Sequence, residues 1–418
     1  MSRQPVIVIG AGLAGLACAV RLRRSGVPVT VLEASDGVGG RMRTDVVDGF
    51  RLDRGFQVLN TGYPEVPRLL DVEALRLRAF NSGMLVFRTD GGKERVMLPW
   101  RHPRHALSGL TADLGTPVDK AVLAAMTARD MAFPAGMVRA GAERTVLDEL
   151  RHWGMSPVMV ERLIRPFLAG VLLERELETS SRVFHLIWRS FARGTIGVPA
   201  LGMGEVPAQL ASRLPPEAVR LRRRVREVAG TGVVLDDGAE LPAAAVVVAA
   251  DPSAAAALLP GLRAPAMRAV TTFYHAAPRS PLGEATQVID GDGVIADTLV
   301  MTDAAPEYSA TDEALISTSV LGAAGDDDEP GVRDRLEEIY GPQARKWRHL
   351  ATYTIAEALP SMPPPMPLRR RVRLGEGLYV CGDHRDTGSI QGALVSGRRA
   401  ADASHEGPVL IISPPAAR

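Results

Sequence analysis

The hydrophobic pattern at the start of the chain predicts a buried parallel strand followed by a helix. Residues 6–9 are consecutive β-branched residues, a run that is typical of a strand covered on both faces. Residues 16–22 form an apolar, helix-compatible run. Because Gly10, Gly12 and Gly15 stand between the two segments, the predicted order is strand, glycine turn and helix.

Each glycine of this turn has its own physical role. Gly10 permits the tight turn, Gly12 lacks the Cβ that would keep a pyrophosphate away from the backbone, and Gly15 lets the helix pack closely on the strand. The N–H groups at the start of a helix have no partners within the helix. We therefore expect the first turn, with Leu13 and Ala14, to face the phosphates of a nucleotide.

The second predicted strand, residues 29–32, completes the pattern of an adenine dinucleotide site. It ends at Glu33, about twenty residues after the glycines, where an acid can accept hydrogen bonds from a ribose. A glycine-rich loop alone is common in turns. Here the strand, the helix, the second strand and the acid occur in register, which disfavours an incidental loop.

The segment after Glu33 indicates which dinucleotide is bound. Gly39, Gly40 and Arg41 resemble the glycine-pair-arginine motif of FAD enzymes in the superfamily of amine oxidases, carotenoid desaturases and protoporphyrinogen oxidases. The resemblance implies that Arg41 reaches the cofactor diphosphate or the region beside the flavin, and it adds Ala34 to the cofactor-binding residues. A planar guanidinium suits a diphosphate better than an ammonium group does.

The end of the chain resembles the C-terminal flavin motif of the same superfamily, in residues 377–383 and 388–397. The resemblance implies that Asp383 binds ribityl or diphosphate-side hydroxyls, and that the helix starting near Ile390 points its dipole at the flavin N1 and O2 region. Because Cys381 precedes this aspartate within a strand, we expect non-covalent FAD. The implied cofactor-binding residues of this motif are Gly382, Asp383, Ser389, Ile390, Gln391 and Ala393.

Two middle segments complete the predicted cofactor site. In the resembled superfamily the segment that contains Gly55, Phe56 and Gln57 passes along the flavin, although Phe56 could equally be a core residue. By resemblance, Val225 binds the adenine edge through its backbone.

Candidate catalytic residues rest on placement alone, because hydride transfer needs no acid or base from the protein. They are Gln57, Tyr353 and His384. A fourth candidate, His185, lies on a predicted amphipathic helix, where a structural role is the simpler interpretation.

The predicted fold class is α/β, with a Rossmann-type FAD-binding domain built from discontinuous segments and an inserted α+β substrate domain that has a mixed sheet and a helical cap. The FAD-binding domain is predicted from residues 1–68, 196–262 and 353–405, the substrate domain from 69–195 and 263–352, and a loose tail from 406–418. Within the substrate domain we expect a helix end broken by Pro166. Residues 362–373 are expected to form a solvated linker.

Composition excludes several classes of protein. The 418 residues include 46% hydrophobic and 23% charged residues, with a formal net charge of +1, so no long-range field favours nucleic acid. Two cysteines, Cys18 and Cys381, cannot form a disulfide framework, and we expect no metal site. No apolar segment is long enough to span a bilayer. We expect a cytoplasmic protein, with contact to a membrane surface left open.

The expected reaction is the abstraction of hydride from a C–H bond onto flavin N5. By resemblance the substrate is a hydrophobic small molecule, isoprenoid-like or porphyrinogen-like, and oxygen or a quinone accepts the electrons. Three alternatives stay open. They are a flavin-dependent amine oxidase, although the lysine that such enzymes place beside N5 has no match here; a non-redox FAD-dependent isomerase or dehydroxylase of an isoprenoid; and a flavoprotein that has lost catalysis.

Overall fold

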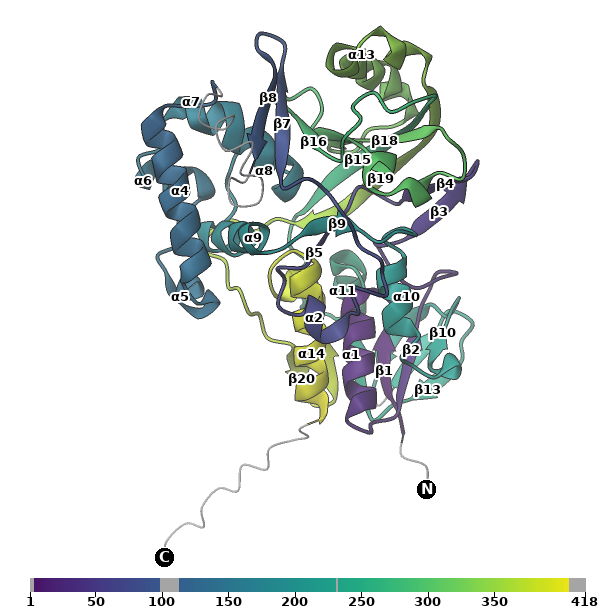
Figure 1. The fold of residues 1–418 in the computed structure, drawn as a ribbon. Coiled ribbons are helices and arrows are strands. Elements are labelled where there is room, and N and C mark those ends of the chain that lie inside the picture. The colour runs from purple at the N-terminus through teal and green to yellow at the C-terminus, as the bar shows by residue number, and fades with distance from the viewer. Residues whose placement is uncertain (1–3, 98–112, 231, 406–418) are drawn as a thin grey trace, which may run out of the picture. The chain divides into compact units, whose positions relative to one another are not determined.

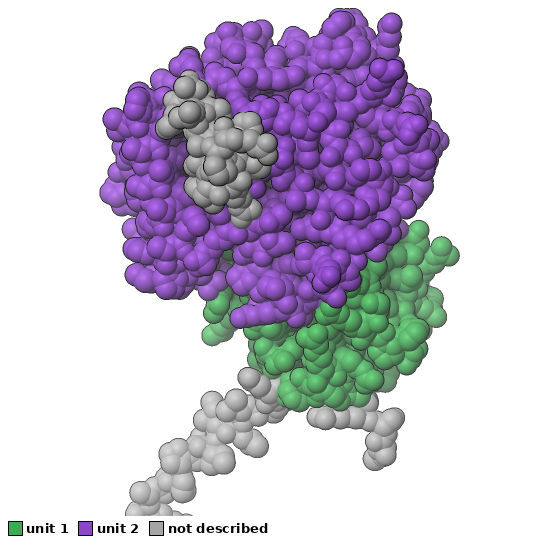
Figure 2. Space-filling view, in the orientation of Figure 1, with its two compact units in different colours: residues 1–40, 207–264, 369–418 green, residues 41–206, 265–368 purple. Residues whose placement is uncertain are grey.

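The computed structural model describes residues 4–97, 113–230 and 232–405, which form two compact units (Figures 1 and 2). Unit 1 comprises Met1–Gly40, Pro207–Ala264 and Arg369–Arg418, and unit 2 comprises Arg41–Val206 and Pro265–Leu368. The predicted tail, residues 406–418, lies outside the described residues.

The elements of unit 1 are β1 (Val6–Ile9), α1 (Leu13–Arg24), β2 (Val29–Leu32), η3 (Pro216–Ala218), β10 (Val219–Arg220), β11 (Val225–Ala229), β12 (Gly232–Leu235), β13 (Glu240–Pro242), β14 (Ala245–Val248), α11 (Pro252–Leu258), β20 (Arg373–Gly375), β21 (Leu378–Val380), η7 (Asp383–Arg385) and α14 (Ile390–His405). The main sheet has the order β10-β2-β1-β14-β21-β20 and is parallel except for β20. Every residue of β1 is buried, as the β-branched run predicted. The Rossmann-type α/β fold is confirmed.

The first and last helices of the described chain pack side by side in unit 1 (Figure 1, purple and yellow). A Cβ at Gly397 of α14 would lie 2.1 Å from the carbonyl oxygen of Ala14 on α1. Only glycine permits this close approach, so the two cofactor motifs predicted from opposite ends of the chain belong to one unit.

The elements of unit 2 are β3 (Thr44–Val47), β4 (Phe50–Asp53), β5 (Leu59–Asn60), α2 (Val66–Leu69), β6 (Arg78–Ala79), β7 (Gly83–Arg88), β8 (Gly92–Met97), α4 (Pro117–Ala132), α5 (Ala135–Ala140), α6 (Val146–His152), α7 (Pro157–Met159), η2 (Val160–Ile164), α8 (Arg165–Leu172), α9 (Ser181–Arg193), β9 (Ile196–Val198), β15 (Met267–Ala277), β16 (Gln287–Asp290), β17 (Asp297–Val300), α12 (Met301–Ala304), η4 (Pro306–Tyr308), β18 (Ala314–Leu321), η5 (Asp326–Asp328), α13 (Glu329–Tyr340), η6 (Pro342–Lys346) and β19 (Arg348–Pro360). The helix α10 (Glu205–Ala211) begins in unit 2 and ends in unit 1. The large mixed sheet of unit 2 has the order β19-β15-β18-β17-β16-β7-β8, in which β16 and β7 are parallel.

The units divide the chain at residues 40, 206, 264 and 368, whereas the sequence suggested 68, 195, 262 and 352. Residues 41–68 and 353–360 belong to unit 2 because their strands pair there. Strand β5 pairs with β9, and β19 pairs along its length with β15.

Two local expectations were wrong. Pro166 does not break a helix, because η2, a π-helical turn, precedes it and the proline occupies the first turn of α8, where no intrahelical donor is required. Residues 362–368 are not a solvated linker. Met362, Met366 and Leu368 are buried in the same hydrophobic cluster as the helices of unit 2, and the Met362 carbonyl accepts a hydrogen bond from the Ser180 N–H at 2.8 Å.

Among the described residues, the helices are all too short or too polar to cross a bilayer.

Candidate functional site

The glycine turn of unit 1 has the geometry that its sequence predicted. Gly10 has a φ of +104°, and a Cβ at Gly15 would lie 2.0 Å from the Gly10 carbonyl oxygen, so neither position accepts a side chain. A Cβ at Gly12 would meet no atom within 4 Å. The space above Gly12 is therefore open to a ligand, and Gly12 begins α1 without a side-chain cap.

Glu33 holds this turn together, a role that sequence reasoning missed. Its Oε2 accepts the Ala11 N–H at 2.7 Å, and its Oε1 accepts the Ser35 N–H at 2.8 Å. Oε1 also accepts the Ser35 hydroxyl at 2.8 Å, whereas Oε2 keeps further acceptor capacity, so hydrogen bonding to a ribose stays a prediction. Ala34, which lies between Glu33 and Ser35 in the chain, is exposed.

The second glycine pair lies against the first turn. The Gly39 N–H donates to the Ala11 carbonyl oxygen at 2.9 Å, and a Cβ at Gly40 would lie 3.4 Å from the Cα of Gly12. Unit 1 thus brings together two glycine motifs separated by more than twenty residues.

The C-terminal motif of unit 1 is tightly packed. Asp383 is buried and its Oδ1 accepts the N–H of His384, whose imidazole covers Gly382 closely enough to exclude a Cβ there. The Ser389 hydroxyl accepts the N–H of Gly392 at 3.1 Å and thereby caps the start of α14. Half-buried residues of this helix start are Ile390, Gln391 and Ala393.

Val225 is buried in a hydrophobic cluster of unit 1 and pairs with Leu235 of β12. Its predicted contact with adenine through the backbone stays a prediction.

The remaining predicted cofactor residues lie in unit 2. The Arg41 guanidinium donates to the Ala358 carbonyl oxygen at 2.6 Å, and the Gln57 Nε2 donates to the Arg41 carbonyl oxygen at 2.9 Å. The Gln57 Oε1 is buried and accepts no hydrogen bond from any described residue. A buried acceptor without a donor is costly, so a donor on a ligand would stabilise it.

The ring of Phe56 is half-buried and stacks on Phe80, with 6.4 Å between ring centroids. The backbone of the segment is fixed, because the Phe56 N–H donates to Thr272 Oγ1 at 3.0 Å and Gly55, with a φ of +87°, approaches Ile355. This segment presents an aromatic face and one amide acceptor.

Two of the candidate catalytic residues are occupied by structural contacts. The Tyr353 hydroxyl donates to Asp45 Oδ2 at 3.0 Å, and burial together with this carboxylate raises the pKa of Tyr353 to about 12. It is therefore no base near neutral pH. His185 is buried among α4, α6 and α9, between the carboxylates of Asp130 and Glu149.

The family model for flavin containing amine oxidoreductase matches residues 13–404. The chain belongs to this family. It is a flavin-dependent oxidoreductase whose cofactor is FAD, and the residues present fit that cofactor. Within unit 1, the open space at Gly12 and the start of α1 without a side-chain cap are features that the pyrophosphate of a dinucleotide would use.

Similar proteins include a desaturase and a dehydroxylase. Hydroxyneurosporene desaturase of Cereibacter sphaeroides is 31% identical over 305 residues, which cover 60% of this chain and 56% of that protein, so the match spans only about half of that relative. Hydroxysqualene dehydroxylase of Rhodopseudomonas palustris is 28% identical over 437 residues, which cover 95% of this chain and 97% of that protein.

Solved structures show the same fold. An oxidoreductase from Methanosarcina mazei has a TM-score of 0.74 at 17% identity and covers 95% of this chain and 100% of its own. Cyclohexylamine oxidase from Brevibacterium oxydans has a TM-score of 0.69 at 20% identity, with coverage of 97% and 99%. At these identities the likeness extends to architecture alone.

Proposed function

We propose that this chain oxidises a hydrophobic small molecule, isoprenoid-like or porphyrinogen-like, by removing hydride from a C–H bond. FAD supplies the acceptor of that hydride at its N5 atom, and oxygen or a quinone then takes the electrons. The names of the relatives support this substrate class. They include the desaturase and the dehydroxylase above, and a protoporphyrinogen oxidase of Arabidopsis thaliana that is 42% identical over 76 residues, 18% of this chain.

The observation that carries the proposal is the chemistry of the segment Gly55 to Gln57. It offers the aromatic face of Phe56 and the buried, unpaired Oε1 of Gln57, but no acid or base. Such a surface suits an apolar substrate, which the amide orients through a hydroxyl or N–H donor. Hydride transfer requires orientation and exclusion of water from the protein, and it requires no side-chain proton transfer.

An amine oxidase is less well supported. The chain has three lysines, Lys93, Lys120 and Lys346, and none of them occurs in a predicted cofactor segment. Lys93 is on β8, at the opposite edge of the sheet from Tyr353 on β19, which corresponds to roughly 29 Å at the usual spacing of strands. Lys120 is on α4, and Lys346 is on η6, which packs against α13.

A non-redox dehydroxylation or isomerisation is the second candidate. It is favoured by the hydroxysqualene dehydroxylase match, because that match extends over nearly the whole of both chains. Net consumption of an electron acceptor separates the two reactions.

The test is anaerobic mixing of the FAD-loaded protein with an isoprenoid, an isoprenoid alcohol, a porphyrinogen or cyclohexylamine, followed by the flavin absorption. Bleaching by an isoprenoid or a porphyrinogen supports the oxidation. Product without net bleaching supports dehydroxylation, and bleaching by the amine alone supports an amine oxidase. If none of these molecules bleaches the flavin or is converted to product, the proposal fails.

A substitution tests the role of Gln57. We expect Gln57→Leu to keep FAD but to slow flavin reduction about tenfold, because one orienting hydrogen bond is lost. The matched control is Gln343→Leu at an exposed position on η6, which should leave the rate unchanged. Equal rates in both variants would remove Gln57 from the site.

A further inference from the structure

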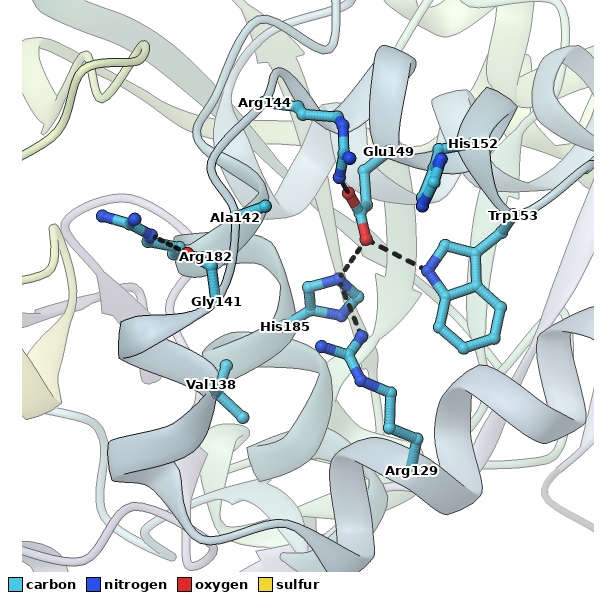
Figure 3. Close-up of a pocket in the computed structure, with 10 residues that line it drawn as sticks. All are labelled: Arg129, Val138, Gly141, Ala142, Arg144, Glu149, His152, Trp153, Arg182 and His185. Atoms are coloured by element: carbon cyan, nitrogen blue, oxygen red, sulfur yellow. Dashed lines mark hydrogen bonds and ion pairs between the residues drawn. The ribbon is translucent and has the colours of Figure 1, made fainter.

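A cavity of about 480 Å³ lies in the helical part of unit 2, among α4, α5, α6 and α9 (Figure 3). Its volume is that of an ordinary small-molecule site. The predicted flavin-binding residues are not among those that line it. The described residues on its wall are Arg129, Val138, Gly141, Ala142, Arg144, Glu149, His152, Trp153, Arg182 and His185.

The wall is rich in positive charge. The described lining residues include three arginines and one carboxylate, that of Glu149, and Arg182 pairs with Glu143, which is not among them. Glu149 is already engaged, because it accepts hydrogen bonds from Arg144 at 2.8 Å and from the Trp153 Nε1 at 3.0 Å. Figure 3 shows Arg144, Glu149, His185 and Arg129 as a connected line, with Trp153 beside it.

His185 lies buried within this line. Its Nδ1 lies 2.7 Å from Asp130 Oδ2, and its Nε2 lies 3.3 Å from Glu149 Oε1, so each ring nitrogen meets a carboxylate. Burial alone would lower the pKa of His185, but the two carboxylates raise it above its usual range. In turn, the hydrogen bond to His185, with those of Trp153 and Arg144, lowers the pKa of Glu149 to about 2.

Arg129 forms a long ion pair with Asp130 and no hydrogen bond to a carboxylate of a described residue. Its Nη1 lies 3.4 Å from the His185 Nε2, and the nearest Asp130 oxygen is 3.6 Å away, beyond hydrogen-bond distance. That oxygen, Oδ1, is buried and accepts no hydrogen bond from a described residue. The guanidinium instead lies over the rings of Trp153 and Phe133, at 5.6 and 5.8 Å from their centroids. An oxyanion in the cavity would give the Arg129 guanidinium the hydrogen-bonded partner that Asp130, at 3.6 Å, does not provide.

We propose that this cavity binds a small organic oxyanion, a carboxylate or a phosphate ester on a small apolar body. The planar guanidinium of Arg129 matches two oxygens of either group. The indole of Trp153 and the side chain of Val138 provide the apolar part of the wall.

The experiment is calorimetric titration of the FAD-loaded full chain with benzoate and with phenyl phosphate. Benzyl alcohol serves as the neutral control of similar shape. We expect one or both anions to bind with an unchanged flavin spectrum, and benzyl alcohol to bind at least tenfold more weakly. The anion that binds more tightly identifies the headgroup as carboxylate or phosphate.

Two variants locate the site. Arg129→Gln should weaken anion binding about tenfold, the usual value of one charge-assisted hydrogen bond. The matched control is Arg151→Gln, which removes the same charge from an exposed position on α6 outside the cavity and should change the affinity less than twofold. Ala142 lies at the exposed part of the wall, and Ala142→Trp should block anion binding because the larger side chain fills the cavity. This variant replaces Arg129→Gln as the test if Arg129→Gln does not fold.

Three results would overturn the proposal. They are binding of the anions no tighter than that of benzyl alcohol, a perturbed flavin spectrum on binding, and equal affinities of the wall variants and Arg151→Gln.

Discussion

The stability of unit 2 in the Asp53→Asn variant, relative to that in the unsubstituted chain, should increase with pH. The Asp53 carboxylate is buried at the end of β4. It accepts hydrogen bonds from Thr44 Oγ1 at 2.5 Å, from the Met203 N–H at 2.9 Å and from the Tyr308 hydroxyl at 2.8 Å. Burial raises the pKa of Asp53 from 3.8 to about 6, although these three donors oppose the shift.

The direction of this pH dependence follows from proton binding. Between pH 3.8 and about 6 the folded state holds the Asp53 proton more tightly than the unfolded state does, so stability falls as the pH rises through this window. The shift of about two pKa units lowers the free energy of unfolding by roughly 3 kcal/mol at pH 8. At pH 4.5 it lowers the free energy of unfolding by only about 1 kcal/mol.

Asparagine has no charge to bury. Its Oδ1 can still accept from Thr44 and Met203, while its Nδ2 requires the Tyr308 oxygen to accept instead of donating. This change of hydrogen-bond direction alters the free energy of unfolding by an amount that does not depend on pH. The stability difference between Asp53→Asn and the unsubstituted chain should therefore grow by about 2 kcal/mol from pH 4.5 to pH 8, in favour of the variant.

Urea unfolding followed by tryptophan fluorescence measures this difference, because Trp153, Trp188 and Trp347 lie in unit 2 together with Asp53. Asp334→Asn, at an exposed position on α13, controls for the loss of one formal charge. A difference between Asp53→Asn and the unsubstituted chain that stays constant over this pH range would refute the reasoning.

Two further substitutions test the packing of each unit. Gly15→Ala should abolish tight FAD binding, because the new Cβ would lie 2.0 Å from the Gly10 carbonyl oxygen, whereas Gly136→Ala has open space and should bind FAD normally. Flavin fluorescence in the filtrate measures the FAD that each variant releases. Equal retention of FAD by the two variants would contradict the close packing of helix and strand. Leu168→Ala removes a side chain that is 1% exposed in the helical cluster, and it should lower the free energy of unfolding, measured in urea, by about 2 to 5 kcal/mol. Val158→Ala, at a position that is 44% exposed, should lower it by less than about 1 kcal/mol. Similar losses in the two variants would contradict the assigned burial.

Elements that depend on consecutive residues could be predicted from the sequence. The β-branched run of residues 6–9, the three glycines after it and the acid at Glu33 predicted a strand, a turn and a dinucleotide-binding unit that the structure contains. Local backbone preference and side-chain periodicity are properties of short segments, so they are readable without the fold.

Contacts between distant segments could not be predicted in this way. The interior position of Met362 depends on helices nearly two hundred residues earlier, and the unbroken helix at Pro166 depends on a π-helical turn that propensity does not indicate. Asp130 is fully buried on α4 beside His185, and no pattern of consecutive residues identified this pair.

Tertiary structure alone decided which buried charges have partners. The sequence placed His185 on an amphipathic helix, but the carboxylates beside His185 come from separate elements. The donors around Asp53 also come from separate elements. The pKa of a buried group depends on its desolvation and on charges within a few ångströms. Those distances are set by packing of remote segments, and for that reason the chemistry of the helical cavity became visible only in the folded chain.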